Sequence, residues 1–134
     1  TELCILCDAD YSEITSKNNI EKIGNLASSL IGDTTKTVIV TGIKHKDEII
    51  NLIVDKSGTN IVKSTLLKGS FSGTGDIFSS IVCGAVTKGM SITESVNLAT
   101  KFITESIKST PSGLDYEPNG VNFQKHLEML INAK

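Results

Sequence analysis

The spacing of apolar residues predicts an amphipathic helix near the beginning of the chain. After Asn18 and Asn19, which suit a helix cap, apolar side chains recur every three or four residues, and Gly32 would end the helix. The members of this apolar stripe are Ile20, Ile23, Leu26, Ala27 and Leu30. Before them, residues 1–7 contain an apolar run that is typical of the inside of a secondary-structure element.

Three β-rich segments follow this helix. Residues 37–41 form a compact run of Thr, Val and Ile closed by Gly42, a pattern typical of a buried strand with a parallel neighbour. Residues 48–54 and 60–66 are also β-rich, and the Asp-Lys-Ser-Gly-Thr sequence between them suits the turn of a hairpin. A helix followed by a buried strand indicates an α/β fold.

The pattern then changes to that of helices. A Gly-rich loop over residues 68–75 leads into a helix-compatible run over residues 76–88. Ser91 and Glu94 have the spacing of a capping box, so a second long helix should begin there and run to about Lys108.

The C-terminal part predicts a loop and a short helix. Residues 109–120 are rich in Pro, Gly and Asp, which is typical of a surface loop. The last residues predict one short amphipathic helix, and its apolar members are Phe123, Leu127, Leu130 and Ile131.

Length and charge narrow the possible functions. The 134 residues suit one domain, and because Thr1 already lies within an apparent structural element, we expect a single partial domain over residues 1–134. The longest uncharged apolar stretch, residues 77–87, is shorter than the roughly 20 residues that cross a membrane, so we expect no membrane contact and a cytoplasmic location. Net charge is −2 and the thirteen lysines are scattered, which argues against a nucleic-acid partner.

The cysteines suggest neither a disulfide framework nor a metal site. There are three of them, an odd number that fits a reducing compartment. Cys4 and Cys7 have the spacing of a metal-binding or redox pair, but no second Cys or His pair accompanies them. Cys83 lies in an apolar run, so we interpret all three as buried and inert thiols.

The chemistry of the chain is concentrated where the Gly-rich loop becomes a helix, at Gly73-Thr74-Gly75-Asp76. Glycines let backbone amides approach an anion closely, and a helix N-terminus adds free N–H groups and a positive dipole end. An acid beside a phosphate would repel it unless the acid has another task, such as taking a proton from an attacking hydroxyl. Asp76 is therefore either a catalytic base or a helix cap, and the four residues alone leave both interpretations open.

Gly73-Thr74-Gly75-Asp76-Ile77-Phe78 resembles the motif of the ribokinase superfamily, in the version of the pyridoxal (vitamin B6) kinases. Sugar kinases of the superfamily usually have Ala at the position of Thr74, and hydroxymethylpyrimidine phosphate kinases usually have Cys at the position of Asp76. Three other segments resemble the family in the same order along the chain. They are Thr1-Glu2 with residues 3–6, Val38-Ile39-Val40-Thr41-Gly42, and Gly120-Val121-Asn122-Phe123.

This resemblance implies a fold and a function. The fold would be the C-terminal, nucleotide-binding portion of a three-layer α/β/α kinase, with a hairpin region over residues 48–66. The activity would be ATP- and Mg²⁺-dependent phosphorylation of the hydroxymethyl group of a B6 vitamer (pyridoxal, pyridoxine or pyridoxamine). Family members are roughly twice as long, so this piece would be weakly active or inactive alone, and the full-length parent would be a homodimer.

The resemblance also implies a role for each matching residue. The amides of Gly73, Thr74 and Gly75 would form an anion hole for the transferred phosphoryl group, and Asp76 would be the catalytic base. The remaining residues would serve the nucleotide and its metal. They are Thr41 and Gly42 along the nucleotide phosphates, and Glu2 as a Mg²⁺ ligand through water.

Two alternatives remain open at this stage. A hydroxymethylpyrimidine (phosphate) kinase would share fold and mechanism and differ in substrate, since pockets on one fold diverge readily. A non-catalytic α/β binding module would retain the Gly-rich loop only as structure.

Overall fold

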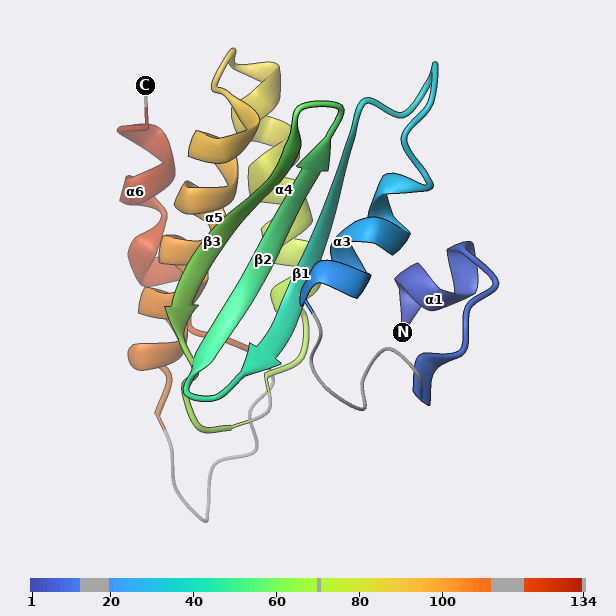
Figure 1. Cartoon of the computed structure of the whole chain (residues 1–134). Coiled ribbons are helices and arrows are strands. Elements are labelled where there is room, and N and C mark those ends of the chain that lie inside the picture. The colour runs from blue at the N-terminus through green and yellow to red at the C-terminus, as the bar shows by residue number, and fades with distance from the viewer. Residues whose placement is uncertain (13–19, 70, 112–119, 134) are drawn as a thin grey trace. The chain divides into compact units, whose positions relative to one another are not determined.

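The computed structural model describes residues 1–12, 20–69, 71–111 and 120–133, which form two compact units, residues 1–63 and 64–134. The elements of the first unit are helices α1 (Glu2–Leu6) and α3 (Ile20–Ser28) and strands β1 (Thr37–His45), β2 (Glu48–Asp55) and most of β3 (Gly58–Thr65). Those of the second unit are α4 (Thr74–Thr87), α5 (Ile92–Lys108), the 3-10 turn η1 (Gln124–His126) and α6 (Glu128–Ile131) (Figure 1). Helices together with a sheet confirm the predicted α/β class.

The sheet has the order β1-β2-β3, and the predicted hairpin of the second and third strands is confirmed. The predicted parallel neighbour of the first strand is wrong, because β1 pairs antiparallel with β2, with Val38 opposite Val54. A tight turn at Lys46 and Asp47 joins these strands, and Lys46 adopts a left-handed φ of 54°. A β-branched run indicates a covered strand, but the direction of its neighbour depends on the connection, which the run does not contain.

The core of the first unit lies between α3 and one face of the sheet. Strand β2 is its centre, and its alternate residues Ile50, Leu52 and Val54 are almost fully buried. Ile20, Ile23 and Ala27 of α3 pack against this core, which confirms three of the five members of the predicted apolar stripe. The predicted Asn cap lies outside the described residues. Helix α3 ends at Ser28, earlier than the Gly32-Asp33 stop that the sequence predicted.

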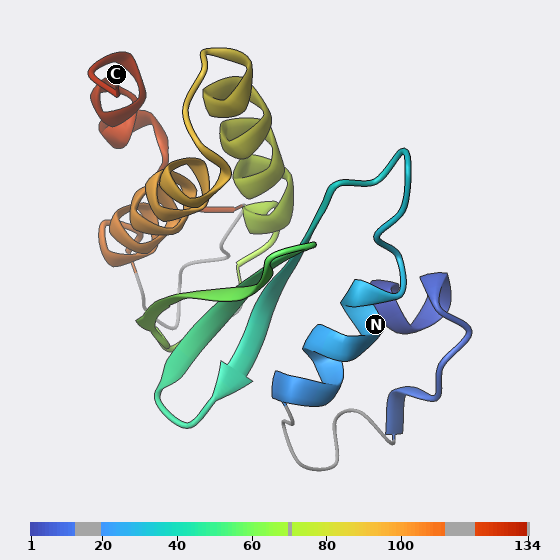
Figure 2. The ribbon, with the colours of Figure 1, turned by 45° about the horizontal axis from the view of Figure 1, so that its top comes forward.

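The second unit is built around α4 and α5, which lie side by side (Figure 2). Helix α5 buries Val96, Ala99 and Phe102 along one face. Its predicted start is confirmed, since the Ser91 hydroxyl accepts from the Glu94 N–H while the Glu94 carboxylate accepts from the Ser91 N–H. The predicted end at Lys108 is confirmed as well.

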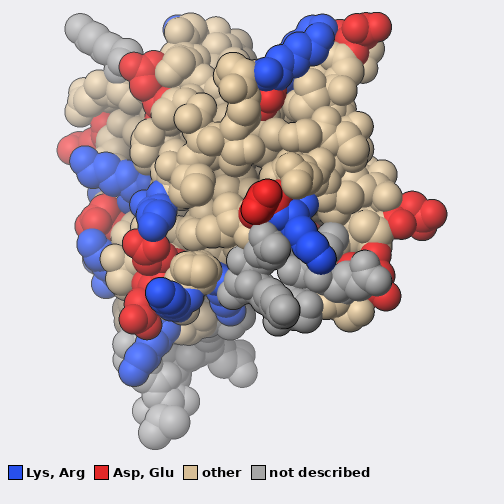
Figure 3. All heavy atoms as spheres, in the orientation of Figure 1, with Lys and Arg blue, Asp and Glu red and all other residues tan. Residues whose placement is uncertain are grey.

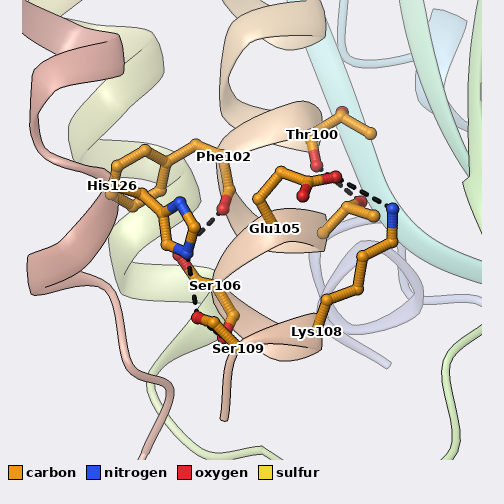
Figure 4. Close-up of polar contacts among 8 residues, drawn as sticks. Thr100, Phe102, Glu105, Ser106, Lys108, Ser109 and His126 are labelled. Carbon is orange, nitrogen blue, oxygen red and sulfur yellow. Dashed lines mark hydrogen bonds and ion pairs between the residues drawn. The ribbon is translucent and has the colours of Figure 1, made fainter.

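The C-terminal residues differ from the prediction in two respects. The single helix proposed around residues 123–131 is interrupted, and η1 and α6 take its place, with Ile131 75% exposed. Most of the predicted surface loop lies outside the described residues, but its start is not on the surface, because Thr110 is buried. The Ser109 hydroxyl lies 2.9 Å from the His126 Nε2, so α5 is tied to η1 by a polar contact (Figure 4).

The cysteine prediction is confirmed only in part. Cys4 is buried and Cys7 is half-buried, but Cys83 is exposed, because it lies on the solvent-facing side of α4. In the described part of the chain, no three His, Cys, Asp or Glu side chains are grouped so that they could hold a metal ion.

Two surface properties complete the description. On the face shown in Figure 3, lysines and acidic residues are interspersed. No helix within the described ranges has both the length and the apolar character needed to span a membrane.

Candidate functional site

Four predicted site residues lie together on the turn that leads into α4. Gly73 precedes the helix with φ of +77°, a left-handed conformation that glycine adopts at no steric cost. The helical hydrogen bonds begin with the Ile77 N–H, which donates to the Gly73 carbonyl oxygen at 3.1 Å. The amides of Thr74, Gly75 and Asp76 therefore precede the ladder and have no carbonyl within α4 to bond.

The space in front of these amides is open. Among the described residues, a β-carbon added at Gly73 or at Gly75 would meet no heavy atom within 4 Å. Helix α4 is 14 residues long, so the partial positive charge of its dipole also acts at this turn. A turn of this kind suits an anion that approaches the backbone directly.

Asp76 lies in the first turn of α4 and its side chain is exposed. Helix α4 begins at Thr74, two residues before the predicted start, so the cap position belongs to Gly73. The interpretation of Asp76 as the helix cap is therefore wrong. Within the described residues its carboxylate has no hydrogen bond and no ion pair, which leaves it accessible to a ligand.

The turn before α4 is supported from two sides of its own unit. The Thr74 hydroxyl donates to the Phe71 carbonyl oxygen at 3.3 Å. Gly120, with φ of +105°, lies beside this turn, since a β-carbon there would be in ordinary van der Waals contact with the Ser72 carbonyl oxygen at 3.7 Å. The Asn122 N–H beyond it donates to the Thr110 hydroxyl oxygen at 2.9 Å. These contacts fix the backbone that precedes the free amides.

Thr41 and Gly42 lie on a bulge of β1, and both are exposed. The sequence predicted that Gly42 closes the strand, but this is wrong, because β1 continues to His45. Gly42 instead adopts φ of +74° where the register of β1 and β2 shifts. Bulges of this type change the direction of side chains and are frequent next to functional sites.

A hollow of about 640 Å³ lies within the first unit beside this bulge. Seven consecutive β1 residues, 38–44, border it together with parts of α1 and α3. Glu2 borders it too, with a side chain that is 94% exposed. The structure thus brings Glu2, Thr41 and Gly42 to one concave surface, which we call the β1 hollow.

Asn51 is a residue of this region that the sequence interpretation missed. It lies in β2 and is only 4% exposed, and its side-chain oxygen accepts the Gly42 N–H at 3.0 Å. A signal was present in the sequence, because Asn51 is the polar member of the apolar run over residues 49–54. A buried polar side chain of this kind needs a hydrogen-bonding partner.

An open backbone turn at the N-terminus of a helix is a ready site for an anion such as a phosphate group. The family model for phosphomethylpyrimidine kinase matches residues 1–120. The chain therefore belongs to the phosphomethylpyrimidine kinase family, within the ribokinase-like superfamily.

Solved structures show the same fold. A Bacteroides thetaiotaomicron protein assigned as a phosphomethylpyrimidine kinase is 26% identical, with a TM-score of 0.84 over 98% of this chain and 45% of its own. Another crystal form of it, with pyridoxal, has a TM-score of 0.82. The pyridoxal kinase of Lactobacillus plantarum is 20% identical, with a TM-score of 0.82 over 98% of this chain and 46% of its own.

A further match is the pyridoxal kinase of Staphylococcus aureus in complex with AMP-PCP and pyridoxal. It is 17% identical, with a TM-score of 0.66 over 87% of this chain and 45% of its own. In these matches the chain spans slightly less than half the length of the solved proteins.

Proposed function

We propose that this chain is the nucleotide-binding half of an ATP-dependent kinase that phosphorylates the hydroxymethyl group of a B6 vitamer. One observation carries the proposal: at the N-terminus of α4 the amides of Thr74 and Gly75 precede the helical hydrogen bonds, and the Asp76 carboxylate has no hydrogen bond or ion pair to the described residues. Phosphoryl transfer depends mainly on positioning and on neutralisation of charge, and this turn offers both.

The amides of Gly73, Thr74 and Gly75 would hold the transferred phosphoryl group. Its oxygens carry negative charge throughout the reaction, and backbone donors fixed in advance stabilise that charge without reorganising. Because Gly75 has no side chain in the open space before the turn, the phosphoryl group can reach the amides.

Asp76 would act as the general base. The hydroxymethyl oxygen of the substrate attacks the γ-phosphorus, and its proton passes to the Asp76 carboxylate. The bond between the γ-phosphorus and the bridging oxygen breaks, and ADP leaves with that electron pair. The Asp76 side chain is exposed and has no hydrogen bond or ion pair to the described residues, which supports this role.

Thr41, Gly42 and Glu2 would serve the nucleotide from the β1 hollow. Mg²⁺ usually keeps several waters and binds one or two carboxylates together with phosphate oxygens. Glu2 fits such a site, since its carboxylate is exposed and borders the same concave surface as the bulge. When bound, Mg²⁺ would neutralise phosphate charge there.

An assay of the full-length protein tests the proposal. Replacing Asp76→Asn keeps the shape of the side chain and removes the base, so the rate of pyridoxal or pyridoxamine phosphorylation should fall roughly 10²- to 10⁴-fold. Binding of an ATP analogue with Mg²⁺ should persist. Asp33→Asn, at an exposed position of the first unit, is the matched control and should leave the rate unchanged. Equal activity of wild type and Asp76→Asn would remove Asp76 from this role.

The second candidate is a hydroxymethylpyrimidine (phosphate) kinase, which the description of the matching family favours. Thr74 and Asp76 favour the B6 branch instead, as does the likeness to pyridoxal kinases. Competition of pyridoxal against hydroxymethylpyrimidine in one assay decides between them, since the preferred substrate suppresses turnover of the other.

Two further expectations extend the proposal. We expect a homodimer and a cytoplasmic location, where ATP is available. If the folded full-length protein failed to bind an ATP analogue with Mg²⁺, the non-catalytic module would be favoured.

A further inference from the structure

The buried side chain of Asn51 is unusual in its surroundings. Strand β2 is otherwise apolar over residues 49–54, and burial of an amide without a hydrogen bond is costly. The Asn51 side-chain oxygen offsets this cost by accepting the Gly42 N–H at 3.0 Å. The backbone of the bulge is therefore one partner of Asn51.

The strand register shows what this contact holds in place. Val40 lies opposite Leu52 and Ile43 lies opposite Ile50, so two residues of β1, Thr41 and Gly42, face Asn51 alone. An extra residue of this kind leaves a backbone group without its ladder partner. The Asn51 side chain takes the place of the missing backbone acceptor.

The bulge also explains the packing of β1. Val38, Val40 and Ile43 all pack against the core of the first unit, although their spacing is two and then three. In a regular strand, alternate residues share a face, so Ile43 would point away from the core. The extra residue restores the packing of Ile43 and leaves Thr41 and Gly42 exposed at the β1 hollow.

We propose that Asn51 is a positioning residue for nucleotide binding, which acts by holding the bulge at Thr41 and Gly42 in the shape that meets the nucleotide phosphates. This inference rests on the proposed function, because it takes the bulge as a nucleotide contact. Backbone groups fixed in advance lose less conformational freedom on binding, so a bulge held by Asn51 binds more tightly than a mobile one.

Three variants of the full-length protein test this role. Asn51→Leu removes the acceptor, and we expect about tenfold weaker binding of an ATP analogue with Mg²⁺, the effect of losing one good contact. Asn51→Asp keeps an acceptor oxygen in the same place but buries a carboxyl group, so it should lower the melting temperature and still bind within a few-fold of wild type. Ile53→Val, on the same strand and equally buried, should lower the melting temperature without changing the affinity.

A second measurement does not depend on nucleotide. The Gly42 amide should exchange slowly with deuterium in wild type and in Asn51→Asp, and faster in the variants that lack the acceptor. Should Asn51→Leu fail to fold, Asn51→Ser takes its place, since serine is polar like asparagine but its side chain is too short to reach the Gly42 N–H.

The outcomes distinguish failure of the proposed function from failure of the positioning role of Asn51. If wild type binds no nucleotide, both the proposed function and this inference are overturned. If wild type binds but the variants without the acceptor bind equally well, only the inference is overturned. Fast exchange of the Gly42 amide in wild type would also overturn it, because the hydrogen bond would then not hold the bulge. The inference is supported if Asn51→Leu weakens binding and exposes the Gly42 amide to exchange, while Asn51→Asp keeps both the binding and the protection of this amide.

Discussion

Gly75 lies in the first turn of α4, and we expect a side chain added there to have opposite effects on folding and on binding. A β-carbon there would touch no other atom of the residues that the structure describes, and the backbone of Gly75 is helical. Nothing in the fold therefore requires glycine at this position, and Ala is the better helix former by about 1 kcal/mol. The absence of a side chain makes sense if the open space before the turn receives a ligand.

We predict that Gly75→Ala leaves the melting temperature unchanged or slightly raised and weakens binding of an ATP analogue about tenfold or more, because the methyl group occupies the space that the phosphoryl group needs. Calorimetric titration of the full-length protein measures the affinity for the ATP analogue, and a thermal melt measures the stability. Gly84→Ala is the matched control, since it lies in the middle of α4 with equally open surroundings. Equal affinity of the two variants would contradict an anion site at this turn.

At the residue scale, local pattern predicted only part of the candidate site. Residues 73–76 were predicted as a candidate site because the pattern of glycines and an acid before a helix is complete within four positions. Asn51 was missed because its partner is nine residues away across a register shift. Register depends on the packing of two strands together, so no single strand shows it.

At the scale of elements, the segments with the clearest periodicity were predicted best. Helix α5 was predicted at both ends, because a capping box marks its start and a Pro- and Gly-rich stretch follows its end. The errors occurred where an element depends on distant residues. The direction of β1 relative to its neighbour and the interruption between η1 and α6 are both of this kind.

The capping box of α5 gives a prediction about acid stability. Hydrogen bonds from the Ser91 hydroxyl and the Ser91 amide lower the pKa of Glu94 from its ordinary value of 4.5. A lowered pKa in the folded state contributes stability above the unfolded pKa, and this stability is lost as the pH falls through the folded value. The stability of wild type should therefore exceed that of Ser91→Ala by less below about pH 4.5 than at neutral pH.

Thermal melts of both proteins between pH 7 and pH 3 measure this difference. At neutral pH, loss of the serine cap should destabilise the protein by about 1 kcal/mol. Ser80→Ala, at an exposed position inside α4, is the control and should show no such pH dependence. A constant difference between wild type and Ser91→Ala across this range would show that the box does not depend on the charge of Glu94.

At the scale of the whole molecule, the chain consists of two compact units, and the predicted site residues are distributed over both. Glu2, Thr41 and Gly42 belong to the first, and the turn before α4 belongs to the second. Each unit can be followed separately through its cysteines.

Cys4 is 6% exposed in the first unit, whereas Cys83 is exposed in the second. We predict that iodoacetamide labels Cys83 quickly in native buffer and Cys4 only when denaturant unfolds the first unit. Cys7, half-buried with its sulfur 3.5 Å from the Leu26 carbonyl oxygen, should react at an intermediate rate. Peptide mass spectrometry measures each site, and Cys83→Ser identifies the fast phase. Equally fast labelling of Cys4 and Cys83 in native buffer would show that α1 does not stay packed in the first unit.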